Sequence, residues 1–147
     1  MDGLEDRKVR IERMWTAAWN HGRLERFDDV LAPEYVRRTS GASRAHGLAT
    51  LKELIRETRR GFPDTRTAID QILVDGDHVA IRWHSTGTHR GVYRGVPPTG
   101  RVVTLEGATF ARFQGEQMVE TWSTWDPAAM LRALGVLTLE GVEHVDE

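Results

Sequence analysis

The spacing of apolar residues along this chain changes once, near Pro63. Before Pro63, apolar side chains recur every three or four residues, as they do on one face of a helix. The first such stripe is Ile11, Met14, Trp15, Ala18 and Trp19. After Pro63, apolar and polar residues alternate with the period of two that is typical of strands. Helices followed by strands predict an α+β fold, with the helices on one face of an antiparallel sheet.

The same pattern predicts the individual elements. A long first helix ends at Asn20-His21-Gly22, a short second helix with Leu24, Phe27 and Leu31 on one side is closed by Pro33, and a third spans residues 51–62. Strands are expected at 35–39, 68–74, 78–88, 101–113 and 118–125, with a closing helix at 127–134. Asp75-Gly76-Asp77 is a tight hairpin signal. The last four strands should form an antiparallel meander.

A strongly curved sheet closed by helices is a cone with an interior. Its other face would also need a cover, and dimerisation is the usual way to provide one. The chain of 147 residues is expected to be a single domain spanning residues 1–147. The sequence leaves open whether its acidic tail, residues 135–147, is ordered.

Composition excludes several classes of function. A net charge of -2 gives no basic footprint for nucleic acid, and the absence of cysteine excludes disulfides and zinc–thiolate sites. No apolar run approaches the ~20 residues that span a bilayer. The start, MDGLEDRKVR, is acidic and lacks the apolar core of a secretory signal. We therefore expect a soluble, cytoplasmic protein that binds neither nucleic acid nor membranes.

The stretch ETWSTWDP, residues 120–127, holds the most prominent candidate for chemistry. Residues two apart share a strand face, so Trp122 and Asp126 point the same way. If Trp122 lines an interior cavity, Asp126 does too, and a carboxylate beside indole rings has a raised pKa that makes it a better proton acceptor. The alternative is structural, because Asp126 before Pro127 is also a good helix N-cap.

Two further polar residues, Arg82 and His84, share a face of the strand at 78–88. Both can donate hydrogen bonds to a developing oxyanion, although a solvated strand face or an ion pair would explain them equally. Arg112 is a candidate substrate contact, but it can instead pair with Glu120 across the sheet. No His, Asp or Glu set has convincing metal-ligand spacing, and His46 has the character of a surface or cap residue.

Aromatic residues are the other candidates for a binding site. Five tryptophans are many for a small chain, and most of them belong to the core by default. Trp15 and Trp19 could face Trp122 across the cone, with Tyr35 adding a phenol at the rim. Such a wall would suit a flat, largely apolar ligand.

Three segments of the sequence resemble those of a known protein family. GTHRGVYRGVPPTGR (87–101), the preceding DGDHVAIRW and the closing RFQGEQMVETWSTWD together resemble the SnoaL-like polyketide cyclases of the nuclear transport factor 2-like superfamily. The resemblance covers nearly the whole chain, including Phe62-Pro63-Asp64. It implies a cone-shaped barrel, a homodimer, and metal-free and cofactor-free chemistry in antibiotic biosynthesis.

In these cyclases an aspartate at the end of the last strand acts as acid/base in an intramolecular aldol ring closure, and Asp126 matches that position. The histidine that some members use in the penultimate strand has no match, since Phe110-Ala111-Arg112 stands there. The triad of limonene epoxide hydrolase is also absent, and Arg37-Arg38 stands near the base position of ketosteroid isomerase.

The resulting hypothesis is a cofactor-independent cyclase acting on a polyketide intermediate. Asp126 would remove a proton, and Arg82 or His84 would steady the enolate. Trp15, Trp19, Tyr35, Trp122 and Arg112 would contact the substrate. Two alternatives remain: another chemistry in the same pocket, such as epoxide opening, hydroxylation or cycloaddition, and a non-catalytic ligand-binding dimer.

Overall fold

The computed structural model describes residues 3–40 and 44–136, with side chains from residue 7 onward. Most of the acidic tail therefore lies outside the described residues. The helical elements are α1 (Gly3–Trp15), the π-helical turn η1 (Thr16–Asn20), the 3₁₀ turn η2 (Leu24–Asp29), α2 (Leu48–Gly61) and α3 (Pro127–Ala133). The strands are β1 (Leu31–Thr39), β2 (Arg66–Asp75), β3 (His78–Thr88), β4 (Val102–Gln114) and β5 (Gln117–Trp125).

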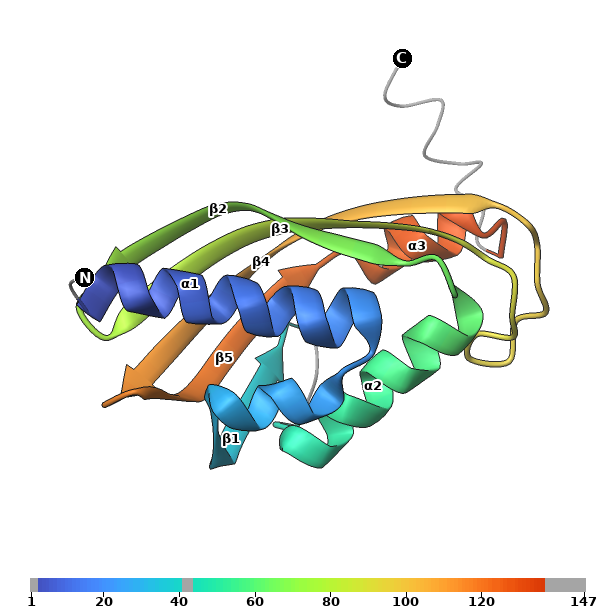
Figure 1. Cartoon of the computed structure of the whole chain (residues 1–147). Helices are drawn as coiled ribbons and strands as arrows, with labels where there is room; N and C mark the ends of the chain where they lie inside the picture. Colours follow the sequence, from blue (N-terminus) through green and yellow to red (C-terminus); the bar gives the residue numbers. More distant parts are fainter. Residues whose placement is uncertain (1–2, 41–43, 137–147) are drawn as a thin grey trace, which may run out of the picture.

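The strands form one five-stranded sheet in the order β1-β5-β4-β3-β2. The four strands after Pro63 pair as the predicted antiparallel meander, and β1 adds to β5 in parallel. The strand register shifts within the β2–β3, β4–β5 and β1–β5 pairs, and such irregularities increase the bend and twist of a sheet. In Figure 1 the long strands arch over α1, and α2 lies below one end of the sheet. The predicted α+β cone is confirmed.

The segment before β1 differs from the expectation. Leu31 and Pro33 were expected at the end of the second helix, but both belong to β1. The helical turn stops earlier because the Val30 carbonyl accepts a hydrogen bond from the Met118 amide at 2.8 Å and Leu31 pairs with Met118. Pro33 has no amide hydrogen to donate, and its place on an edge strand tolerates that loss.

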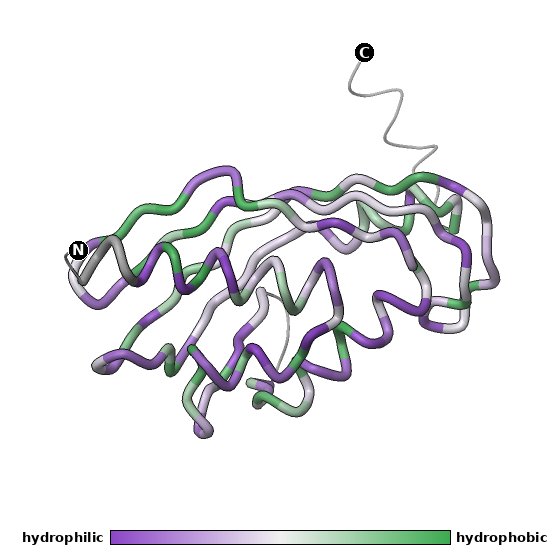
Figure 2. Tube along the Cα trace, viewed as in Figure 1, coloured by the Kyte–Doolittle hydropathy of each residue, from purple (hydrophilic) through white to green (hydrophobic). Residues whose placement is uncertain are grey.

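The core lies between α1 and the concave face of the sheet. Side chains along an extended strand alternate between its two faces, and Figure 2 shows both hydrophobic and hydrophilic positions along the long strands. Its largest fully buried side chains include Phe27, Phe113, Ile11, Ile55 and Ile81. A smaller cluster of Phe62, Tyr93, Val103 and Leu134 joins α3 and the loop between β3 and β4 to the end of α2. No helix among the described residues is long and apolar enough to cross a membrane.

Candidate functional site

A cavity of about 550 Å³ occupies the interior of the cone. Its wall is largely apolar and includes four tryptophans, Trp15 and Trp19 from the first helical segment and Trp83 and Trp125 from the sheet. The rings of Trp15 and Trp19 lie 6.2 Å apart and are tilted by 37°. The structure thus places Trp15, Trp19 and Tyr35 in the cavity wall, as the sequence predicted.

Polar groups gather in one corner of the cavity, along β1. Tyr35, Arg37 and Thr39 alternate along the strand and all line the cavity. His46 reaches the same corner because it forms an isolated antiparallel bridge with Arg37, through amide–carbonyl hydrogen bonds of 2.7 and 2.8 Å. Side chains of directly opposed residues project from the same face. We call Tyr35, Arg37, Thr39 and His46 the polar corner.

Hydroxyl groups on the sheet extend this corner. The Tyr35 phenol and the Thr121 hydroxyl share a hydrogen bond of 2.5 Å. Farther along the wall, the Trp83 indole donates to Thr109 Oγ1 at 3.1 Å, and Thr109 is 2.9 Å from Ser123 Oγ. These groups are neutral donors and acceptors, so they can orient carbonyl oxygens of a ligand without imposing a charge.

Burial changes the protonation behaviour of two corner residues. It raises the pKa of the Tyr35 phenol, against the opposing effects of the hydrogen bond shared with Thr121 and of the charge of Arg37. Tyr35 therefore stays protonated at neutral pH and can act as a donor. Burial also lowers the pKa of Arg37, Tyr35 opposes this shift, and the positive charge of Arg94 adds to it. A guanidinium nevertheless stays charged near neutral pH, so the corner carries a cation.

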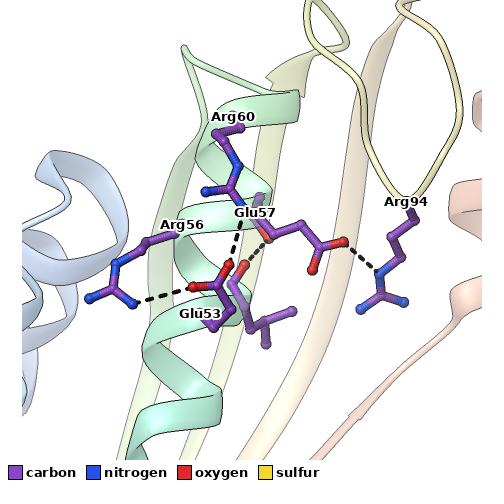
Figure 3. Close-up of polar contacts among 7 residues, drawn as sticks. Glu53, Arg56, Glu57, Arg60 and Arg94 are labelled. Atoms are coloured by element: carbon purple, nitrogen blue, oxygen red, sulfur yellow. Dashed lines mark hydrogen bonds and ion pairs between the residues drawn. The ribbon is translucent and has the colours of Figure 1, made fainter.

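The mouth of the cavity carries charged residues from α2 and from the loop between β3 and β4. Glu57 on α2 and Arg94 on the loop line the opening and approach each other at 3.7 Å (Figure 3). Glu53 lies one turn earlier and accepts hydrogen bonds from Arg60 at 3.0 Å and Arg56 at 3.4 Å. These hydrogen bonds, the one from Arg60 foremost, lower the pKa of Glu53.

Asp126 does not line this cavity, so the expectation that it faces the interior is wrong. Its carboxylate accepts hydrogen bonds from the amides of Ala128 at 3.0 Å and Ala129 at 3.2 Å, and it caps α3. Its other oxygen lies 3.4 Å from Arg132, and its side chain is 61% exposed. Asp126 is therefore the helix N-cap before Pro127, which was the other role that the sequence allowed.

Arg82 and His84 also point away from the cavity, contrary to the expectation. They share a face, as predicted, but it is the outer face of the sheet. His84 Nδ1 lies 2.8 Å from Asp70 Oδ1, and Arg82 lines a shallow depression with Asp70 and Glu106. The physical reason is that Ile81, Trp83 and Ser85, at the alternate positions of β3, fill the concave side.

The same alternation excludes Trp122 and Arg112 from the cavity wall. Trp122 is 39% exposed on the outer face, next to Phe110, while Thr121, Ser123 and Trp125 take the inner positions of β5. Arg112 lies 3.6 Å from Glu120, so its alternative role as a cross-strand ion pair is confirmed. Trp125 supplies the indole that was expected from Trp122.

The sequence reading missed Arg37 and His46. Alternation along 35–39 already placed Arg37 on the face of Tyr35, which was the available signal. His46 had no such signal, because its position depends on the bridge to Arg37 between segments that are not continuous in one strand. In the part of the chain that the structure describes, no group of three or more His, Cys, Asp or Glu residues is arranged to hold a metal ion.

Comparison with known proteins agrees with this architecture. The family model of the SnoaL-like polyketide cyclases matches residues 9–134. AclR, named "a putative hydroxylase", from Streptomyces galilaeus is 29% identical with a TM-score of 0.82, over 92% of this chain and 100% of that chain. IdmH, named "a putative polyketide cyclase", from Streptomyces antibioticus is 28% identical with a TM-score of 0.76, again over 92% and 100%.

A polyketide cyclase named "putative" from Acidithiobacillus ferrooxidans is also 28% identical, with a TM-score of 0.78 over 92% of this chain and 98% of that chain. Comparison with curated proteins gives no match. The family model spans most of the chain and includes the helices, the sheet and the residues around the cavity. The chain is therefore a member of the SnoaL-like polyketide cyclase family.

Proposed function

We propose that this protein closes a ring in a polyketide intermediate held inside the cavity, by acid/base-assisted aldol chemistry and without a cofactor. The observation that carries the proposal is the contrast within the cavity, where a largely apolar wall with four tryptophans adjoins the polar corner. An aromatic wall packs against a flat, largely apolar chain, and a few placed polar groups fix its orientation. Family membership supports the same substrate class.

The polar corner offers groups for each step of such a reaction. The imidazole of His46 accepts a proton from a carbon flanked by two carbonyls, since a neutral histidine is a suitable base near neutral pH. The protonated phenol of Tyr35 donates a hydrogen bond to the enolate oxygen. The enolate carbon then attacks the carbon of another carbonyl, farther along the substrate chain, and the resulting alkoxide recovers the proton from His46.

The flanking carbonyls delocalise the negative charge of the enolate, so this step requires no metal ion. General acid/base assistance of this kind contributes about 10²–10⁴-fold in rate. Holding the two reacting ends together in the cavity contributes much of the remainder. Asp126, the acid/base candidate from the family resemblance, is replaced in this scheme by His46 because its carboxylate caps α3 outside the cavity.

The test is turnover of linear poly-β-ketone acids and esters, with ring closure followed by absorbance and product mass. His46→Gln and Tyr35→Phe should each lower the rate by about 10²-fold or more if they act as base and donor. Asp126→Asn serves as the comparison variant and should retain the rate. Unchanged turnover in both His46→Gln and Tyr35→Phe, with folding verified by thermal melts, would contradict the proposed roles.

A second candidate is a different reaction in the same cavity, and the similarity to AclR, named a hydroxylase, favours it. Hydroxylation adds an oxygen atom to the product, whereas aldol closure keeps the substrate mass or loses water. Epoxide opening and cycloaddition are distinguished in the same way, from the product's mass and ring connectivity. A cavity that binds these compounds without converting any of them would identify a non-catalytic binding protein.

We also propose that the protein is a homodimer formed through the outer face of the sheet. A row of cross-strand neighbours, Leu73, Ala80, Phe110 and Trp122, crosses this face. Leu73 and Phe110 are 58% and 54% exposed, and large exposed apolar side chains in one row are typical of an interface. The expected cytoplasmic location of this small-molecule enzyme stays a prediction.

A further inference from the structure

Among the residues with described side chains, Arg37 forms no ion pair, whereas Arg38 and Arg94 each form one. Its guanidinium lines the cavity and donates a 3.0 Å hydrogen bond to the Thr39 hydroxyl, but among the residues with described side chains no carboxylate forms an ion pair with it. Arg38, the next residue, pairs with Glu120 at 2.9 Å on the outer face. The unpaired cation is thus on the cavity side.

A cation in a site of this kind is costly unless an anion approaches it. The hydroxyl of Thr39 satisfies one donor of the guanidinium and supplies no negative charge. A guanidinium has five N–H donors in a planar fork, and this geometry matches the two oxygens of a carboxylate. The unused donors and the uncompensated charge both point to an anionic group of the ligand.

Arg94 adds a second positive charge to the lining of the cavity. It belongs to the loop between β3 and β4 and lines the cavity together with Arg37. Figure 3 shows its contact with Glu57, in which Arg94 Nε lies 3.7 Å from Glu57 Oε1. This distance is longer than that of a direct hydrogen bond. The positive charge of Arg94 lowers the pKa of Arg37, as expected for two cations that sense one another. A ligand anion near Arg37 would relieve this repulsion.

We infer that Arg37 binds a carboxylate of the substrate, so that the protein acts on a free polyketide acid rather than on its ester or a carrier-bound thioester. This inference rests on the proposed function, because it takes the cavity as the substrate site. The carboxylate anchors one end of the chain in the polar corner, and the apolar remainder lies against the tryptophans. A hydrolysis step must then precede this enzyme, because hydrolysis of a carrier-bound thioester or of an ester produces the free acid.

The inference can be tested without turnover, with 2-naphthoic acid and methyl 2-naphthoate as probes. Both are flat and aromatic, and neither has an enolisable carbon, so a difference in affinity reports the carboxylate alone. Isothermal titration should show that the wild-type protein binds the acid about tenfold or more tightly than the ester, as expected for hydrogen bonds to a charged group. Arg37→Met should remove this preference and leave the ester affinity within about threefold.

Arg38→Met is the matched control, because it removes a guanidinium from the adjacent position on the opposite face. It should keep the preference for the acid. If Arg37→Met does not fold, Arg37→Lys is the second variant, and it should show a reduced preference because a lysine keeps the charge but loses the fork.

Equal binding of acid and ester by the wild-type protein would overturn the inference and leave the proposed function intact. A full preference for the acid in both Arg37→Met and Arg37→Lys would also overturn it. Failure of both probes to bind would remove the cavity as a binding site, and with it the proposed function itself.

Discussion

Thr121 and Asp126 lie five residues apart, the first within β5 and the second directly after it. Thr121 enters the cavity and shares a hydrogen bond with Tyr35. Asp126 follows the strand and turns its carboxylate onto the first amides of α3. The strand ends at Trp125, so Thr121 lies within it and lines the cavity, whereas Asp126 lies beyond it and stabilises a helix.

The role of Asp126 can be decided by two substitutions. Asparagine caps a helix about as well as aspartate, so Asp126→Asn should keep both stability and turnover. Asp126→Ala should lose about 0.5–2 kcal/mol of stability through the lost cap, with turnover unchanged. Thermal melts and rates measured on both variants provide the check. A loss of about 10²-fold in the rate of a stable Asp126→Asn protein would restore its assignment as the general base.

At the scale of the elements, the inner face of the sheet is shaped by one close approach. Gly107 on β4 is the cross-strand neighbour of Trp83 on β3 and of Trp125 on β5. A β-carbon at this position would lie 2.3 Å from the Trp83 ring and 2.8 Å from the carbonyl of Thr124. The absence of a side chain at Gly107 leaves the space that the Trp83 indole occupies.

Gly107→Ala should therefore displace the Trp83 indole and weaken its hydrogen bond to Thr109. Overpacking of this kind costs about 1–3 kcal/mol of unfolding free energy, which urea denaturation followed by tryptophan fluorescence would measure. Gly47→Ala is the control, since the nearest atom to its added carbon is 3.9 Å away. If Gly107→Ala costs no more than Gly47→Ala, the indole does not depend on this gap.

At the scale of the whole molecule, the chain combines a covered concave face with an exposed convex face. The concave face carries the cavity, and both tyrosines, Tyr35 and Tyr93, line this cavity and are buried. The convex face carries the apolar row from Leu73 to Trp122 with charged neighbours. The buried tyrosines should make the stability of the fold decrease at alkaline pH. The exposed apolar row should make dimer formation depend on protein concentration.

Burial raises the pKa of both phenols. In the unfolded chain a phenol ionises near pH ~10, whereas in the folded protein it stays neutral to higher pH. Stability from these groups is therefore complete below about pH 10 and decreases as the pH rises further, toward the folded pKa values. Urea denaturation at several alkaline pH values should show this decrease, and Tyr35→Phe should reduce its slope. A stability that is flat up to about pH 11 would contradict the expectation.

The proposed dimer should be sensitive to charge in the apolar row. Sedimentation should give a dimer at micromolar concentration, and Phe110→Glu should shift it to the monomer, because a carboxylate buried in an apolar interface lacks a partner. The control is Glu116→Gln at the exposed β4–β5 turn, and this substitution should leave the dimer unchanged. A wild-type monomer under the same conditions would exclude this interface.

Local patterns in the sequence determined the class of fold and most of the strands. The change from a period of 3.6 to a period of two is a property of the chain itself, so the helices, the hairpin at Gly76 and the four-strand meander were predictable. The aromatic wall from Trp15 and Trp19 followed from the same helical stripe. Alternation also showed correctly that Arg82 and His84 share a face, because Ile81, Trp83 and Ser85 take the inner positions of the same strand.

Only the tertiary structure decided which face is covered. Alternation relates residues to each other, but the packing of α1 and α2 determines which side becomes the interior, and that packing joins segments far apart in the chain. The parallel pairing of β1 with β5 and the bridge that brings His46 beside Arg37 are likewise long-range contacts. The candidate site is therefore the polar corner and not Asp126. A short-range sequence pattern contains no information about contacts between residues that are distant in the chain, such as the one between Arg37 and His46.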